Sequence, residues 1–243
     1  MRNLFTLCKK EIAAFFNSLI AYIVMTVFLT GIGLFFWVLG DHILLSGNAE
    51  LSTLFDLGPW MFLFLVPAIT MRSFSEEYKT GTIEFLRTKP ITDWEIVLGK
   101  YLAAVLLVFF SLLPTLVYYS TVYYLGNPVG NIDSGAVWGA YLGLFGIGAV
   151  FAAIGIFSST ITDNQIVAFI TGVFLCFFLY FSFDFLAELE IFGEFTDTIV
   201  SIGILEHYRS ISRGVIDSRD VIYYMSVIFI ALFAGKTVFS TKR

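Results

Sequence analysis

Six runs of predominantly apolar residues restrict what this chain can fold into more than any other feature. A membrane-spanning helix needs about 20 such residues, and the second run is the shortest of the six. The runs are unbroken, whereas the strands of a membrane barrel would alternate polar and apolar residues. The sequence therefore predicts an all-α membrane protein with six transmembrane helices. The predicted spans are Ser18–Leu39, Leu57–Met71, Tyr101–Leu125, Gly135–Phe157, Ile166–Ala187 and Val221–Phe239.

The composition agrees with a chain that lies mostly in lipid. Hydrophobic residues make up 58% of the 243 residues and charged residues only 14%, whereas a soluble domain carries about 25% charged residues. The first run is longer than the core of a signal peptide and no small-residue cleavage site follows it, so we expect it to be retained. We interpret residues 1–243 as a single membrane-spanning domain, with the lipid bilayer as its surroundings.

The basic residues predict the orientation, because lysine and arginine concentrate in cytoplasmic loops. With a cytoplasmic N-terminus, eleven of the 14 basic residues fall inside, and only Arg209, Arg213 and Arg219 fall outside. Both termini are then predicted to be cytoplasmic. The net charge of −5 arises mostly in outer loops and argues against nucleic acid as a partner.

The residues before the first span segregate by polarity on a helical wheel. The basic residues Arg2, Lys9 and Lys10 lie on one side. The apolar side consists of Leu4, Phe5, Cys8, Ile12, Phe15, Phe16 and Leu19. This pattern favours an amphipathic helix in the cytoplasmic interface, with its basic side toward the lipid headgroups. A simple basic lead-in to the first span is the alternative.

The segment Arg72–Lys100, between the second and third spans, is the most polar part of the chain. It holds ten of the 33 charged residues, five of each sign. Ser75 followed by Glu76 and Glu77 is typical of a helix start, and Gly81 is expected to break that helix. The segment is too short to be a domain, but it suits binding by a separate protein.

A second short helix is predicted to begin with Thr82 as its cap and to end before Pro90. Thr92 is then predicted to cap a third helix that leads into the next span. The apolar residues of the second helix are Ile83, Phe85 and Leu86. We expect Phe85 and Leu86 to be exposed, where they would fit a partner's groove. A solvated loop that folds back on its own spans is the alternative.

Small residues mark the fourth span as a packing helix. Gly139 and Gly143 form a Gly-x-x-x-Gly pattern, which allows close approach of another helix, either within the subunit or across a dimer. Pro67 and Pro114 lie inside the second and third spans and are expected to kink them.

The segment Glu188–Asp220 precedes the last span and has mixed polarity. Within it Phe195, Ile199 and Ile202 recur at helical spacing. We expect short helices that lie on the outer leaflet or dip partly into it.

Candidate catalytic and metal-binding residues are few. His42 and His207 fall in outer segments, where we expect a polar contact for His207 rather than catalysis. Asp184, the only carboxylate inside the predicted spans, lies near an outer end, whereas an ion-coupled transporter would place one near the midplane. Cys8 and Cys176 have no metal-ligand neighbours. The sequence thus indicates no enzyme, cofactor or metal site in this chain.

The stretch R-S-F-S-E-E-Y-K-T-G-T-I-E-F-L-R-T-K-P-I-T-D-W-E-I-V-L-G-K resembles the cytoplasmic loop of ABC-2-type transporter permeases. Three more stretches resemble the gliding-motility-associated (GldF-type) branch of that family. They are K-K-E-I-A-A-F-F-N-S-L-I-A-Y, S-S-T-I-T-D-N-Q-I-V-A-F and E-H-Y-R-S-I-S-R-G-V-I-D-S-R-D-V-I-Y. The likeness covers essentially the whole chain.

The resemblance implies an export permease of a bacterial inner membrane and a second permease subunit, as a homodimer or heterodimer. ATP would be bound by a separate ABC ATP-binding subunit, since no Gly-x-x-x-x-Gly-Lys-Ser/Thr motif occurs here. A coupling helix would run from Gly81 to Thr88. Its docking and coupling residues would be Glu76, Glu77, Gly81, Thr82, Glu84, Phe85, Leu86 and Pro90.

Three other functions remain open at this point. A secondary transporter or channel is disfavoured by the missing midplane charges, and an intramembrane enzyme by the missing catalytic residues. A membrane anchor that holds a cytoplasmic ATPase without transport would use the same loop. The apolar, aromatic-rich spans are compatible with a lipid, a glycan-lipid or a peptide as substrate.

Overall fold

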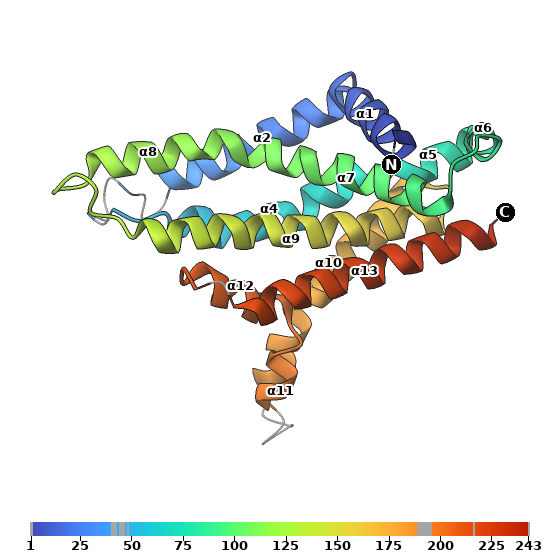
Figure 1. Cartoon of the computed structure of the whole chain (residues 1–243). Helices are drawn as coiled ribbons and strands as arrows, with labels where there is room; N and C mark the ends of the chain where they lie inside the picture. The colour runs from blue at the N-terminus through green and yellow to red at the C-terminus, as the bar shows by residue number, and fades with distance from the viewer. Residues whose placement is uncertain are drawn as a thin grey trace.

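The computed structural model describes residues 2–39, 43, 47, 49–188, 196–215 and 217–242. Every regular element in these ranges is a helix, which confirms the all-α prediction. In chain order the elements in Figure 1 are α1 (Arg2–Phe16), α2 (Leu19–Trp37), α4 (Ser52–Thr70), α5 (Arg72–Thr80), α6 (Ile83–Arg87), α7 (Asp93–Leu112), the 3-10 turn η1 (Leu113–Thr115), α8 (Leu116–Leu125), α9 (Ser134–Ile161), α10 (Gln165–Glu188), α11 (Thr196–Val200), α12 (Ile204–Ser212) and α13 (Ser218–Thr241).

Six helical segments in the described ranges are long and apolar enough to cross a membrane, as predicted. They are α2, α4 with α5, α7 with η1 and α8, α9, α10 and α13. The second span is longer than predicted, because α4 begins at Ser52 and not at Leu57. Asp56 and Pro59 both lie inside α4. The additional first turn of α4 buries Leu54 in the core, which stabilises the helix before Leu57.

The two ends of the bundle differ in what they carry. Both termini lie at one end together with α5 and α6 (Figure 1). We call this the termini end. The opposite end, the loop end, carries residues 126–133 between α8 and α9.

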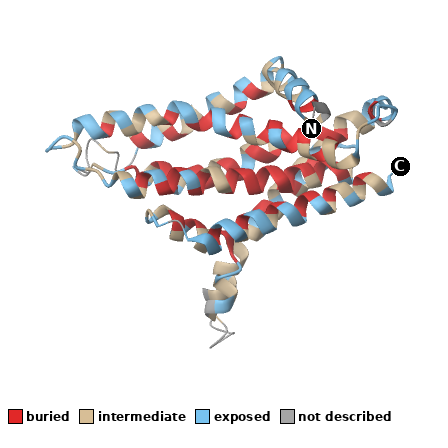
Figure 2. Ribbon diagram, viewed as in Figure 1, coloured by how far each residue is buried: buried red, intermediate tan, exposed pale blue. Residues whose placement is uncertain are grey.

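Helix α9 is the centre of the bundle. It packs against α4, α7, α10, α12 and α13, and Figure 2 shows it buried along most of its length. Small residues make this position possible. A Cβ atom on Gly148 would lie 2.6 Å from the Val108 side chain, so a larger residue would force α7 away from α9.

Proline residues in the spans leave backbone carbonyls that need other partners. In α4, Pro59 has no N–H to offer the carbonyl of Phe55, one turn earlier. The buried hydroxyl of Tyr208 on α12 donates to that carbonyl at 2.7 Å. At Pro114, the α-helix gives way to the 3-10 turn η1 before it resumes as α8.

The segment between α10 and α13 forms two short helices that differ in packing. Helix α12 lies against α9, whereas α11 projects away from the bundle (Figure 1). Ile199 lies in α11, but Ile202 lies in the turn that follows it. Phe195, the first residue of the predicted repeat, and His42 lie outside the described residues.

The N-terminal helix α1 lies across α7 at the termini end. Its buried residues are Leu7 and Cys8, and Leu7 was not on the predicted apolar side. The cause is Gly99 on α7, where an added Cβ would lie 2.9 Å from the Leu7 side chain. Phe5, predicted among the apolar contacts, is exposed. The apolar side of α1 is therefore divided between a protein contact and an exposed face.

Candidate functional site

The polar segment after α4 continues as a helix almost without interruption. Met71 separates α4 from α5, so Ser75 lies within α5 and does not begin it. The Ser75 hydroxyl donates to the carbonyl of Met71, one turn back. The prediction of a helix start at Ser75 is therefore wrong. A serine in a helix interior can satisfy its hydroxyl in this way, and the contacts of α5 with α9 and α10 keep the residue buried.

The break after α5 falls at the predicted residue. Gly81 ends the helix with a left-handed backbone, at φ 72°, a conformation that glycine adopts without strain. Thr82 precedes α6, but its side chain caps no backbone N–H. Its hydroxyl lies 2.9 Å from that of Thr80, so the capping role predicted for Thr82 is wrong.

Helix α6 has one face inward and one face outward. Ile83 and Leu86 are buried in the main hydrophobic core, with Leu86 only 7% exposed. Phe85 is 74% exposed, and Glu84 beside it is also exposed. Spacing explains this, because residues three apart share a helix face. The prediction that Leu86 is an exposed contact is therefore wrong, and Phe85 is the exposed apolar residue of α6.

The chain after α6 follows the sequence prediction more closely. Pro90 lies exposed in the bend that separates α6 from α7. Thr92 caps α7, because its hydroxyl accepts from the Glu95 N–H at 3.3 Å while the Glu95 carboxylate accepts from the Thr92 N–H at 3.0 Å. This reciprocal pair is a capping box. It fixes where the third span begins.

A buried lysine connects three helices beneath this segment. Lys100 on α7 is 1% exposed. Its Nζ atom donates to Glu77 Oε1 on α5 at 2.8 Å and to Glu11 Oε1 on α1 at 3.2 Å. Hydrogen bonds between charged groups are among the strongest in proteins. This cluster, which we call the Lys100 triad, holds α1, α5 and α7 in a fixed relation.

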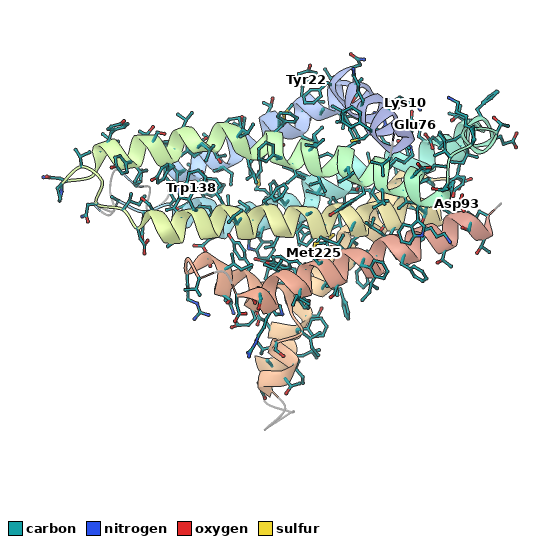
Figure 3. The ribbon with its side chains drawn as sticks, in the orientation of Figure 1. Lys10, Tyr22, Glu76, Asp93, Trp138 and Met225 are labelled. Atoms are coloured by element: carbon teal, nitrogen blue, oxygen red, sulfur yellow. The ribbon has the colours of Figure 1, made fainter. Side chains whose placement is uncertain are left out.

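The neighbouring Glu76 has a different partner. Its two carboxylate oxygens accept from Arg72 Nε at 2.7 Å and from Arg72 Nη2 at 3.2 Å. Both residues lie on α5 and both side chains are partly exposed. Glu76 and Lys10 of α1 line one cavity at the termini end, where Figure 3 labels both. The predicted acidic pair therefore separates into one local contact and one contact between helices.

Sequence reasoning missed Lys100 and Glu11 as site residues. A signal was present, because Lys100 is a lysine among the apolar residues at the start of a span. Such a lysine needs a buried carboxylate nearby. Glu11, Glu76 and Glu77 were all candidates, and the sequence did not distinguish among them.

The end of α13 is held to the same region. Ser240 Oγ donates to Asp93 Oδ2 at the start of α7, at 2.8 Å. Lys242 Nζ donates to the Ile161 carbonyl at 2.6 Å, where α9 ends. A cation at this position also compensates the negative end of the α9 dipole. Figure 3 labels Asp93 at this end of the bundle.

The predicted packing glycines face a helix of the same chain. A Cβ atom on Gly139 would lie 2.6 Å from the Ile211 carbonyl oxygen and 2.8 Å from Gly214 Cα. One on Gly143 would lie 3.0 Å from the Tyr208 ring. These contacts place α12 and its following turn directly on the Gly-x-x-x-Gly face of α9. The face is thus covered within the subunit.

The polar residues of the segment between α10 and α13 contact one another and the start of α13. The Nδ1 atom of His207 lies 2.7 Å from Asp220 Oδ1, and Nε2 lies 2.9 Å from the Ser201 carbonyl. Both ring nitrogens are therefore engaged, as the expected polar contact requires. Arg209 Nη1 lies 3.4 Å from Asp184 Oδ2, so the carboxylate near the C-terminal end of α10 has a cationic neighbour.

The two cysteines are free and lie apart from any metal-binding arrangement. Burial and the nearby Glu11 carboxylate raise the pKa of the Cys8 thiol, which keeps it protonated and weakly nucleophilic. Cys176 is buried in α10. Within the described residues, no group of three or more histidine, cysteine, aspartate or glutamate side chains could hold a metal ion.

Six membrane-length helices, with a polar helical segment between the second and third, define a multi-pass membrane protein. The comparison with protein families gives the particular family. Residues 52–197 match the family described as "ABC-2 family transporter protein", and the chain belongs to it. The match runs from the start of α4 into α11 and so includes the Lys100 and Glu77 members of the triad. No curated protein matches the sequence.

Proposed function

We propose that this chain is the membrane-spanning subunit of an ATP-driven exporter in a bacterial inner membrane. The segment Arg72–Lys100 would dock on a separate ATP-binding subunit in the cytoplasm, and a second permease subunit would complete the pore. Family membership supports a permease with an ATP-binding partner. The distribution of basic residues supports a cytoplasmic position for the termini end.

One observation carries the proposal. The exposed side chain of Phe85 on α6 is connected, through α6 and α5, to the buried contacts of Leu86 and of the Lys100 triad. Phe85 is exposed on α6, while Leu86 beside it is in the core. Through Gly81, α6 follows α5, and α5 is held to α1 and α7 by the Lys100 triad. A force on α6 therefore reaches three helices and two spans.

This arrangement supports a largely rigid-body mechanism. Closure of two ATP-binding subunits would move α6, and the buried contacts of Leu86 and Lys100 would resist internal bending. The motion would then pass to α4 and α7, which lie on either side of the segment, and from α7 to the central helix α9. Packed interfaces of this kind shift between discrete arrangements and do not deform continuously.

The first test is association with the ATP-binding subunit. Phe85→Ala should weaken co-purification, because docking would bury the Phe85 side chain and the burial of such an apolar side chain contributes about 1.5–3 kcal/mol. The matched control is Phe5→Ala, which removes an equally exposed phenylalanine from α1 at the same end. If Phe85→Ala co-purifies as well as the parent, the segment docks elsewhere or not at all.

A second measurement separates export from a simple anchoring role. The ATPase rate of the partner is measured with and without this chain in reconstituted membranes. A permease should change that rate, and Phe85→Ala should reduce the change. An ATPase rate that this chain leaves unaltered, with binding intact, would favour a membrane anchor.

The assumed sidedness has its own test. Single cysteines at Lys79 and Asp163 should react with a membrane-impermeant reagent only after the inner face is exposed, and one at Asn131 should react from outside. Labelling of the Lys79→Cys variant from outside would overturn the proposed docking.

We propose gliding motility as the process served, on the strength of the sequence stretches that resemble that branch. Deletion of the gene in its native host should abolish surface spreading, and the parent chain should restore it. Normal spreading of the deletion strain would remove this role and leave the permease proposal intact.

A further inference from the structure

A cavity at the termini end lies between α1, the start of α2, the end of α4 and α5. Its volume is about 390 Å³. One wall is polar and contains Glu77, Lys100 and Ser73, while Phe15, Ile20 and Ile69 form an apolar wall. Lys10 lies in the lining as well, and Figure 3 shows it on α1 above α5. The cavity thus carries charged and apolar surfaces on different sides.

The polar wall has two buried oxygen atoms without a hydrogen-bond partner. They are Glu77 Oε2 and Ser73 Oγ. Ser73 is 7% exposed, and the Glu77 side chain is 17% exposed. The two residues are four apart on α5, so they share one face of the helix. Buried polar atoms without a hydrogen-bond partner are rare, and a bound donor group is one way to satisfy them.

The charges around these atoms favour a cation. The Lys100 triad contains two carboxylates and one ammonium, so it carries a formal charge of −1. Arg72 does not offset this charge, because its guanidinium is paired with Glu76. Lys10 lies 3.8 Å from Glu11 with its side chain 63% exposed, so it compensates only from the rim. The deep part of the cavity is therefore negative and its rim positive.

We propose that this cavity binds the headgroup of a membrane lipid that carries a primary amine and a phosphate, of the phosphatidylethanolamine type. The ammonium has three N–H donors, which can reach Glu77 Oε2 and Ser73 Oγ. The phosphate then lies toward Lys10 at the rim. The acyl chains follow the apolar wall along Phe15 and Ile69. Lipid binding here does not require the ATP-binding subunit, although Glu77 also belongs to the Lys100 triad.

The position in the fold favours a lipid over a free amine. Ile20 lies in the first turn of α2 and Ile69 at the end of α4, so the cavity is level with the ends of two spans. Headgroups occupy this level of a bilayer, and α1 lies where an interfacial helix contacts them. A soluble amine would leave the apolar wall uncovered.

The test uses the full chain purified in detergent, with bound lipids counted by native mass spectrometry. Phosphatidylethanolamine and phosphatidylcholine of the same acyl composition are titrated in parallel. We expect one phosphatidylethanolamine to bind about tenfold more tightly, because the quaternary ammonium of phosphatidylcholine has no N–H to donate to the carboxylate. Equal binding of the two lipids would overturn the proposal, because it would show that the cavity does not recognise the primary amine of the headgroup.

Variants locate the bound lipid. Glu77→Gln should weaken phosphatidylethanolamine binding about tenfold and Ser73→Ala about threefold, in proportion to the hydrogen bonds lost. Ser73→Ala keeps the Lys100 triad intact and therefore serves if Glu77→Gln does not fold. The control is Asp163→Asn, which removes an exposed carboxylate from the turn between α9 and α10.

Two further outcomes decide the assignment. Undiminished preference for phosphatidylethanolamine in Ser73→Ala and Glu77→Gln would place the lipid elsewhere on the protein. Displacement of the lipid by an equal concentration of free phosphoethanolamine would overturn the assignment to a lipid. Retention of the lipid under that challenge, together with the loss in the variants, would support it.

Discussion

The two ends of this molecule are held together by different kinds of contact. At the termini end, α1, α5 and α7 meet through the Lys100 triad, and α13 is fixed by hydrogen bonds from Ser240 and Lys242. Toward the loop end, α12 lies on α9 because Gly139 and Gly143 leave room for its backbone and for the Tyr208 ring. At the termini end, ion pairs join helices that also pack closely, as Leu7 does on Gly99, whereas in the α9–α12 contact the glycines let backbones touch.

The difference between the two kinds of contact indicates which end of the bundle can receive a movement from outside. Contact through glycines depends on shape, and a small displacement loses it entirely. The Lys100 triad holds α1, α5 and α7 in a fixed relation, so a force applied at the termini end moves the three helices together. The termini end is therefore the part of the bundle suited to receive motion, and the α9–α12 contact is suited to resist it.

The largest expected effect comes from filling the glycine contact. Replacement of both Gly139 and Gly143 with Leu should prevent α12 from packing, because even a Cβ at Gly139 would overlap the Ile211 carbonyl. We expect loss of monodisperse protein in size-exclusion chromatography. The control is Gly126→Ala, where the added atom would meet ordinary contacts of 3.4 Å and longer. A well-folded double variant would show that the α9–α12 contact does not depend on close approach at Gly139 and Gly143.

The Lys100 triad should give the next largest effect. Lys100→Met leaves the Glu11 and Glu77 carboxylates without their cation, and breaking a buried pair costs about 3–5 kcal/mol. We expect a lower midpoint of thermal unfolding in detergent. The combined replacement of Lys100 by Met with Glu11 and Glu77 by Gln should recover much of the loss. If the single variant is as stable as the parent, the triad does not hold the three helices.

Helix α6 offers a comparison between adjacent residues. Leu86→Ala should lower the free energy of unfolding by about 2–4 kcal/mol, since it removes a buried side chain. Phe85→Ala should change it by less than about 0.5 kcal/mol, because surface substitutions have small effects. Thermal unfolding of both variants measures the difference. Equal stability of the two would contradict the inward position of Leu86.

The smallest effect separates the two acidic residues of α5. Glu77→Gln should destabilise the protein by about 1.5–3 kcal/mol, because it removes a charged hydrogen bond to buried Lys100. Glu76→Gln should cost only about 0.3–0.5 kcal/mol, as is usual for exposed pairs four apart on a helix. The parallel measurement of both midpoints tests this order. An equal loss of stability in the two variants would mean that the buried Glu77–Lys100 contact contributes no more than the exposed Glu76–Arg72 pair.

Much of the architecture was predictable because it depends on local chemistry. The spans follow from apolar runs, the end of α5 from Gly81, and the start of α7 from the Thr92–Glu95 capping box. Each of these features is decided within a few neighbouring residues. The position of Pro90 after α6 belongs to the same group.

What the sequence did not reveal depends on contacts between distant segments. Ser75 reads as a cap until the packing of α5 against α9 shows it to be interior. Leu86 reads as an exposed contact because a five-residue helix has no pattern long enough to show its buried face. Lys100 contacts Glu11 because α1 packs on α7 at Gly99, and it contacts Glu77 on α5; neither contact can be read from neighbouring residues.

The hydrogen bond from Tyr208 to the Phe55 carbonyl has a consequence for how this sequence can change. The bond exists because Pro59 removes the usual donor to that carbonyl. Loss of the tyrosine hydroxyl would leave the carbonyl unsatisfied while the proline remains, but an alanine at position 59 would supply the missing N–H. The two positions are therefore epistatic, and a lineage that lost the proline would be free to lose the tyrosine hydroxyl as well.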